Sequence, residues 1–520
     1  MNKPLTAKQG LRAPKAQKHT KPTVLQNTAV ITAVSCFERA LGFLYRIVLA
    51  RLLGAEGVGV YQIALSHSLL FQTASGGGIP VTLSRTVSTL NAQGKSRFSS
   101  GALSASLLLG LCISLPCTLF LLPFAEHIPF FATDAPVLKI LTLSLIATSA
   151  YVAIKGYFWG NKEFFTPAAL EMAEQIFTVA LGVLFLSGAQ GLTALQGAER
   201  AAWAHTLACV LSFLLALAVL LIRKLKPTSP RPFFRPLLRS AMPITAVRVG
   251  TTATGAAVAV LFPLALMQSG MSESMALRAF GVVTGMAMPL LCAPLTIIGS
   301  LAIVLVPELA EAAQKRNLVK LRHNVERSLL FSLALTCLLL PFYVALGDSL
   351  GALAYQNAMA GEMISRSAPI LLPLGMHAIL TSVLNSLGFE RKTLMLSLVG
   401  SALFLTGVCF LPPLVGVYAF PLSMFLQMTL ELICGFTILQ KSCPLSAAFA
   451  KKSFLLVAAT VPICLLGKCL KNLFSTALGA WLTPICTAAT LALLLACGYF
   501  ICKSILFKKR KKLVHTLDNR

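Results

Sequence analysis

Long apolar runs separated by short polar segments fill most of this sequence, and they determine the expected architecture. Each run is near the roughly 20 residues that a helix needs to cross the hydrocarbon of a bilayer. We therefore expect an all-α polytopic membrane protein with about 14 transmembrane helices. The predicted spans are 27–50, 58–78, 101–123, 137–158, 166–187, 201–222, 243–267, 279–305, 328–346, 367–387, 393–412, 416–439, 453–469 and 480–502.

A repeated feature divides these spans into two halves. Gly76–Lys95 closes the second span and Ser300–Asn317 closes the eighth, and each places a proline before a short amphipathic helix. Paired spans interrupted by Gly or Pro at equivalent positions are typical of transporters. An offset of six spans predicts two pseudo-repeated six-helix lobes around a central cavity. The expected segments are a basic tail at 1–23, lobes at 24–225 and 226–445, two extra helices at 446–505 and a basic tail at 506–520.

Composition agrees with a membrane protein. The chain has 520 residues, of which 56% are hydrophobic and 12% charged, with a mean hydropathy of +0.80. Soluble domains are about a quarter charged. The net charge of +27 does not indicate nucleic acid, because most of the 44 lysines and arginines lie in the tails and in alternate loops. By the positive-inside rule, this distribution places both termini in the cytosol.

Catalytic chemistry has few residues to use in this chain. The longest outer loop, around Gly347–Ser365, has fewer than 20 residues, and the chain has three aspartates. HExxH, DxD and GxSxG motifs are absent, and the 14 cysteines include no CxxC. We expect no enzyme activity, cofactor, metal site or disulfide.

The first span carries charge inside an apolar run. Thr28–Leu53 contains Glu38, Arg39 and Arg46. Charge in hydrocarbon is costly, so these side chains should face a protein interior or a wet cavity. Arg39 and Arg46 are seven residues apart, which puts them on nearly the same helix face. One interpretation is a phosphate site, because guanidinium binds phosphate in a fork geometry. In the other, Glu38 or an acid on another helix neutralises the arginines.

A third arginine, Arg248, lies early in the seventh span, in a run rich in Gly, Ala and Thr. Such a run permits close helix packing or forms a wet wall. Arg248 is therefore either a third cavity cation, supplied by the second half, or a side chain that reaches the interface.

Isolated acids occur in two further spans. Glu171 and Glu174 share one helix face at i, i+3. They form a proton or cation coupling site, or serve as partners of basic residues, or begin an amphipathic helix near the headgroups. Glu431 in the twelfth span is a coupling-ion ligand or a structural partner. We interpret His67, His205 and His377 as packing histidines.

A helix break closes the second span at Gly76, Gly77, Gly78 and Pro80. It is not a phosphate-binding loop, because no GK[ST] follows. We expect a hinge, or irregular backbone that faces a cavity.

Several segments in order resemble a known family. ERALGFLYRIVLARLLGAEGVGVYQ, GGGIPVTLSR, TPAALEMAEQIFTV and MPITAVRVG resemble the stage V sporulation protein B family, over about residues 24–505. That family is in the polysaccharide branch of the multidrug/oligosaccharidyl-lipid/polysaccharide flippase superfamily, and it is related to the MurJ lipid II flippases.

The resemblance implies alternating access for a lipid-linked sugar precursor in the bacterial cell membrane. Arginines of the first lobe hold the diphosphate in the lipid II flippases. Arg39 matches one such position, whereas the next arginine of that pattern falls on Tyr45, one position before Arg46. The implied partners are a lipid-linked oligosaccharide, membrane lipids, a coupling ion (Na⁺ or H⁺) and wall-synthesis enzymes.

Two other functions remain open at this point. The first is an ion-coupled small-molecule exporter of the same fold, whose cavity would favour acids and aromatics over arginines. The second is a non-transporting scaffold of a wall-synthesis complex, which would have no reason to retain a mid-span arginine. A membrane glycosyltransferase is disfavoured by the short loops and few aspartates.

Overall fold

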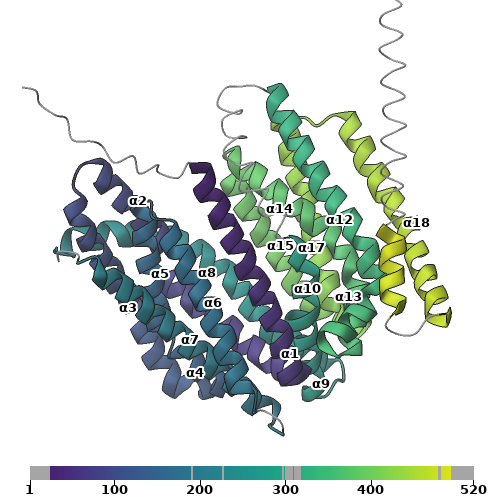
Figure 1. The fold of residues 1–520 in the computed structure, drawn as a ribbon, viewed down its shortest axis with the longest axis horizontal. Coiled ribbons are helices and arrows are strands. Elements are labelled where there is room, and N and C mark those ends of the chain that lie inside the picture. The colour runs from purple at the N-terminus through teal and green to yellow at the C-terminus, as the bar shows by residue number, and fades with distance from the viewer. Residues whose placement is uncertain are drawn as a thin grey trace, which may run out of the picture.

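The computed structural model describes residues 24–188, 191–224, 228–295, 318–477 and 482–492, together with Ile298 and Leu309. Every regular element within these ranges is helical (Figure 1). This confirms the predicted all-α architecture.

A first group of helices precedes residue 223. The chain runs through α1 (Val24–Gly76), α2 (Ile79–Ala92), η1 (Ser96–Phe98), α3 (Ser99–Phe124), η2 (Ala125–His127), α4 (Ala135–Thr142), α5 (Leu145–Gly160), α6 (Phe165–Leu186) and α7 (Ala194–Ile222). Local sequence explains some of the ends. Thr193 and Gln196 form a reciprocal capping box at the start of α7, which satisfies backbone N–H groups that the first turn leaves free.

A second group follows after α8 (Arg231–Gln268). It comprises α9 (Glu273–Phe280), the π-helix η3 (Gly281–Ala287), α10 (Met288–Cys292), η4 (Ala293–Leu295), α12 (Leu318–Tyr355), α13 (Ala358–Ser367), η5 (Ala368–Ile370), α14 (Leu371–Ser386), α15 (Glu390–Phe410), α16 (Pro412–Val415), η6 (Gly416–Tyr418), α17 (Ala419–Ser442) and α18 (Ala447–Ala477).

The described residues contain 11 helices that are long and apolar enough to cross a membrane, or up to 12 if the bent pair α4 and α5 counts as one span. One of the 11, Cys36–Ala92, has 57 residues and covers the first two predicted spans. The chain kinks between them at Gly54, whose φ of 69° is readily accessible only to glycine. Parts of the spans predicted at 279–305 and 480–502 lie outside the described residues. The count of 14 therefore stays a prediction.

Figure 1 shows the two groups side by side, with α1 between them. Helix α8 connects them, because it packs on α1, α2 and α3 and also on α9 and α15. Helix α18 packs on α12 at the outer edge of the second group. The bounds of the two lobes and of the C-terminal appendix remain predictions.

The groups meet most closely where α1 crosses α9 and η3. A Cβ atom on Gly59 would lie 2.1 Å from the carbonyl oxygen of Leu277, and one on Gly281 would lie 2.0 Å from that of Ala55. A Cβ on Gly285 would lie 2.2 Å from the side chain of Val58. We call Gly59, Gly281 and Gly285 the glycine junction. Small residues allow two membrane helices to approach in this way.

We expect Gly281→Ala to destabilise the protein by about 1–3 kcal/mol, because the added methyl group overpacks the junction. Thermal unfolding of the purified protein in detergent measures this change. Gly255→Ala in α8 is the matched control, since nothing lies within 4 Å of the place that its added methyl group would take. Equal stability of the two variants would contradict the close contact.

Candidate functional site

A cavity of about 620 Å³ lies between the two groups of helices. Its walls come from α1, α6 and α7 on one side and from α10 and η4 on the other. The polar side chains that line it are Glu38, Arg39, Gln62, Gln175, Thr178, His205, Arg46 and the tyrosines Tyr45 and Tyr61. These polar side chains share the cavity wall with apolar ones such as Phe43, Leu49 and Leu65.

Arg39 and Arg46 both line this cavity, and both are exposed. Neither guanidinium has a carboxylate within 4.0 Å among the described residues. Arg46 lies within electrostatic range of Tyr61, Cys292 and Tyr355, so it acts on both groups of helices. Among the described residues, the structure therefore places two arginines without an ion-pair partner about two helical turns apart, both on the wall of one cavity.

Glu38 lines the same cavity, yet it makes no ion pair with either arginine. It lies within electrostatic range of Glu171, Glu174 and Lys155, as well as of Arg39. Glu38 of α1 and the two acids of α6 therefore lie near one another, with Lys155 of α5 among them.

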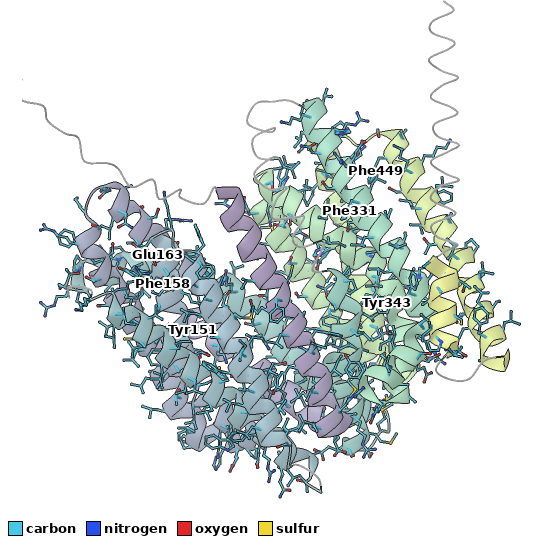
Figure 2. All side chains as sticks on the ribbon, in the orientation of Figure 1. Tyr151, Phe158, Glu163, Phe331, Tyr343 and Phe449 are labelled. Atoms are coloured by element: carbon cyan, nitrogen blue, oxygen red, sulfur yellow. The ribbon has the colours of Figure 1, made fainter. Side chains whose placement is uncertain are left out.

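Lys155 is the counter-ion of this group. Its ammonium lies 3.1 Å from a carboxylate oxygen of Glu171 and 4.5 Å from the ring centroid of Tyr151. Figure 2 labels Tyr151 among the helices of the first group. Of the alternatives for Glu171, the structure brings the acid to a basic partner, and Glu174 lies beside the same pair.

Arg248 is not among the residues that line this cavity. Its guanidinium donates a hydrogen bond of 2.9 Å to the carbonyl oxygen of Gly77. The neighbouring Thr245 accepts one of 3.0 Å from the backbone N–H of Gly78. One face of α8 therefore satisfies the backbone groups that the break between α1 and α2 leaves free.

The glycines of this break are closely packed. A Cβ on Gly78 would lie 2.4 Å from the carbonyl oxygen of Ala241, and one on Gly76 would lie 2.9 Å from the side chain of Val152. Pro80 follows in the first turn of α2. Because α8 and α5 both touch the break, a movement here would be transmitted to both groups. The hinge role of these four residues stays a prediction.

Polar contacts beyond the cavity close the junction between the two groups. Glu56 of α1 accepts hydrogen bonds from Ser274 at 2.7 Å and from Arg278 at 3.1 Å, both on α9. Arg51 donates to the carbonyl oxygens of Leu353 and Ala354. These carbonyls belong to the last turn of α12, where a helix leaves them without an internal partner. We call these contacts of Arg51 and Glu56 the latch.

The structure also pairs residues that the sequence left apart. Glu431 of α17 is 2% exposed, and its carboxylate lies 2.5 Å from Nε2 of His377 on α14. His67 of α1 lies 3.0 Å from Asp134, and both side chains are fully buried. His205 is among the residues that line the cavity, and its packing role stays a prediction. The sequence of α17 does contain one sign of a buried polar site, because Gln427 and Glu431 are four residues apart and share a helix face.

Neither a metal nor a disulfide site is evident among the described residues. No group of three or more His, Cys, Asp or Glu side chains there is arranged to hold a metal ion. The cysteines of these ranges are free thiols.

Comparison with known proteins gives similar sequences and similar folds. The chain is 27% identical to the stage V sporulation protein B of Bacillus subtilis (strain 168) over 476 residues, 85% of this chain and 88% of that protein. It is 23% identical to the sporulation protein YkvU of the same organism over 290 residues, 54% of this chain and 64% of that protein.

Two solved structures share the fold. The lipid II flippase MurJ, in an inward closed conformation, aligns with a TM-score of 0.69 and 13% identity over 91% of this chain and 100% of that one. An inward-facing multidrug resistance MATE family transporter of the MOP superfamily aligns with a TM-score of 0.63 and 14% identity over 79% of this chain and 96% of that one. The chain therefore shares its fold with these two solved proteins.

The family described as polysaccharide biosynthesis protein matches residues 24–313, which is more than half of the sequence. This match contains the cavity arginines, the helix break and the glycine junction. The chain is a multi-pass membrane protein and belongs to the polysaccharide biosynthesis protein family.

Proposed function

We propose that this protein is a flippase that moves an undecaprenyl-diphosphate-linked peptidoglycan or polysaccharide precursor across the bacterial cytoplasmic membrane. The observation that carries the proposal is the pair of arginines on the cavity wall, neither of which has an ion-pair partner among the described residues. A diphosphate supplies two adjacent anions, and guanidinium binds each with a fork of N–H donors. The similarity to stage V sporulation protein B and to MurJ supports the same class of substrate.

The charge distribution gives a direction to this cavity. With the termini in the cytosol, the arginines lie on the part of α1 that precedes Gly54, and the latch lies near Gly54 at the outer side. Arg39 and Arg46 are exposed, whereas Val58, which follows Gly54 at the outer side, is buried. We infer that this conformation receives substrate from the cytosol and is closed toward the outside.

The other cavity residues have separate roles in this mechanism. Gln62, Gln175 and Thr178 provide hydrogen-bonding groups for sugars. Glu38 keeps the cavity from binding anions too tightly, because it places one negative charge beside Arg39. The polyprenyl chain remains in the hydrocarbon, where it costs nothing to desolvate.

Small-molecule export is the second candidate function, because the solved MATE transporters share this fold. A cavity for cationic drugs would present acids without competing cations. Here two arginines line the cavity, and Lys155 of α5 already forms an ion pair with Glu171 of α6. The balance of charge favours an anionic substrate.

Arg39→Ala should slow flipping by about 10- to 100-fold, because hydrogen bonds to a charged group contribute about 1.5–3 kcal/mol and about 1.4 kcal/mol is a factor of ten. Arg39→Lys should be intermediate, since it keeps the charge and loses the fork. The assay is movement of labelled undecaprenyl-diphosphate disaccharide-pentapeptide between the leaflets of proteoliposomes.

Arg85→Ala, on the exposed surface of α2, is the matched control and should flip at the wild-type rate. Wild-type activity in Arg39→Ala would disprove the role of the cavity cation. Absence of flipping in the wild type itself would direct attention to other glycan lipids, and then to small molecules.

Glu56→Gln should weaken the latch and raise the population that is open to the outside. An exposed ion pair contributes about 0.2–1 kcal/mol, so the open fraction should rise by up to about fivefold. A version of the chain with Cys292 as its sole cysteine reports this from the cavity wall, through its rate of labelling by an impermeant thiol reagent added outside.

Glu126→Gln is the control for this measurement, because it breaks the Lys139–Glu126 pair inside the first group. Its labelling rate should match that of the parent protein. Identical rates in Glu56→Gln and Glu126→Gln would show that the latch does not control opening.

A further inference from the structure

The second group of helices contains a buried acid–base pair that the cavity does not use. Oε2 of Glu431 lies 2.5 Å from Nε2 of His377, and Gln427 donates a hydrogen bond of 2.9 Å to Oε1 of the same carboxylate. The hydroxyl of Thr381 lies 3.2 Å from the same Nε2. Both carboxylate oxygens of Glu431 therefore have a hydrogen-bonding partner.

The surrounding helices are shaped to hold this carboxylate. A Cβ on Gly400 of α15 would lie 2.0 Å from Oε1 of Glu431, so only a glycine leaves room for the acid there. Glu431 retains 2% of its side-chain exposure, whereas His377 retains 20%. The imidazole is thus the more accessible partner, and the carboxylate is enclosed behind it.

No fixed cation compensates Glu431 among the described residues. Among these residues, His377 is the only basic side chain within ion-pair distance of the Glu431 carboxylate. Nothing else on α14 is titratable. The other titratable side chains on the packed helices are Lys320, Arg322, His323, Glu326, Arg327, Cys337, Tyr343, Asp348 and Tyr355 on α12, Glu390, Arg391, Lys392 and Cys409 on α15, Tyr418 on η6, and Cys434 and Lys441 on α17.

Two of these cations, Lys392 and Lys441, are remote from the pair along their own helices, and Arg322 of α12 pairs with Glu326 instead. Lys392 is eight residues before Gly400, and Lys441 is ten residues after Glu431. At a rise of 1.5 Å per residue, these separations are about 12 and about 15 Å along the helices. The charge of Glu431 in this part of the chain thus depends on the proton state of His377.

The number of protons on the pair is controlled by access to water. With one proton, shared between Nε2 and Oε2, the pair has no net charge. Its loss leaves an uncompensated carboxylate inside the membrane, which carries a desolvation penalty of several kcal/mol. The packed conformation therefore holds the proton, and a conformation that admits water between α14 and α17 releases it.

We propose that His377 and Glu431 form a proton-binding site, through which one proton moving inward is exchanged for each lipid-linked substrate moving outward. The proton enters from water and leaves to water, and only N–H and O–H bonds are formed and broken. The exchange rests on the proposed function for its substrate. The proton site itself does not, and it is tested separately below.

The exchange is tested with the full chain in proteoliposomes across a gradient of one pH unit. One proton over one pH unit is about 1.4 kcal/mol, equivalent to a tenfold ratio. Wild-type protein should therefore concentrate labelled undecaprenyl-diphosphate disaccharide-pentapeptide about tenfold in the leaflet on the acidic side. Glu431→Gln and His377→Asn should both distribute the lipid without regard to pH.

Glu390→Gln, an exposed acid at the start of α15, is the matched control and should keep the tenfold ratio. The proposal is overturned if Glu431→Gln or His377→Asn keeps this ratio. It is also overturned, with the flippase function intact, if wild-type protein flips the lipid but ignores the gradient.

Infrared difference spectroscopy between acidic and alkaline buffer tests proton binding in the purified protein without any substrate. A protonated-carboxyl band that disappears on raising the pH should be present in wild type and in Glu390→Gln, and absent in Glu431→Gln. In His377→Asn the band should titrate at a different pH. A wild-type band that survives in Glu431→Gln would overturn the site, whatever the lipid assay shows. If wild type shows the band and does not flip the lipid, the proton site stands and the proposed substrate fails.

Discussion

The cost of placing charge in hydrocarbon governs this molecule more than any other interaction. Each charged group inside a span needs a partner or water, and the structure supplies both solutions. Lys155 and Glu431 have partners on neighbouring helices, and Arg248 donates to a free backbone carbonyl. Arg39 and Arg46 have none among the described residues, so their charge requires the wet cavity that they line. The cavity is thus a condition for the stability of the first span as well as a place for a ligand.

Close packing complements this at the other end of the same helix. Before Gly54, α1 carries the exposed cavity arginines. Beyond Gly54, it makes the closest contact between the two groups, at the glycine junction. There the backbones touch, and the latch adds polar contacts around them. One long helix therefore joins the open part of the site to its closed end. Helix α8 also contacts both groups, because Arg248 donates to the Gly77 carbonyl at the helix break and the same helix packs on α15.

The sequence predicts much of this architecture, because the membrane imposes a length and a hydropathy on each span. The spacing of Arg39 and Arg46 also suffices to place them on one face, since both lie on a single helix. Contacts between helices are not accessible in the same way. His377 and Glu431 are 54 residues apart, and no local pattern indicates which face of α14 meets α17. The same holds for Arg248, whose partner is a backbone carbonyl and leaves no trace in side-chain composition. A histidine in an apolar run is interpreted as a packing residue from sequence alone, because the acid that it pairs with lies on another helix.

The π-helix η3 gives the glycine junction a consequence of its own. A π-helix carries an extra residue per turn relative to an α-helix, and such segments are frequent at functional sites. Here it contains Gly281 and Gly285 of the glycine junction, and the chain reaches the cavity wall at Cys292 soon after it. Conversion of the segment to α geometry would change the register of hydrogen bonds by one residue and turn the following helix by about 100° about its own axis. The residues that α10 presents to the cavity would then change. The geometry of η3 therefore links the closest contact between the two groups to the part of the cavity wall that α10 supplies.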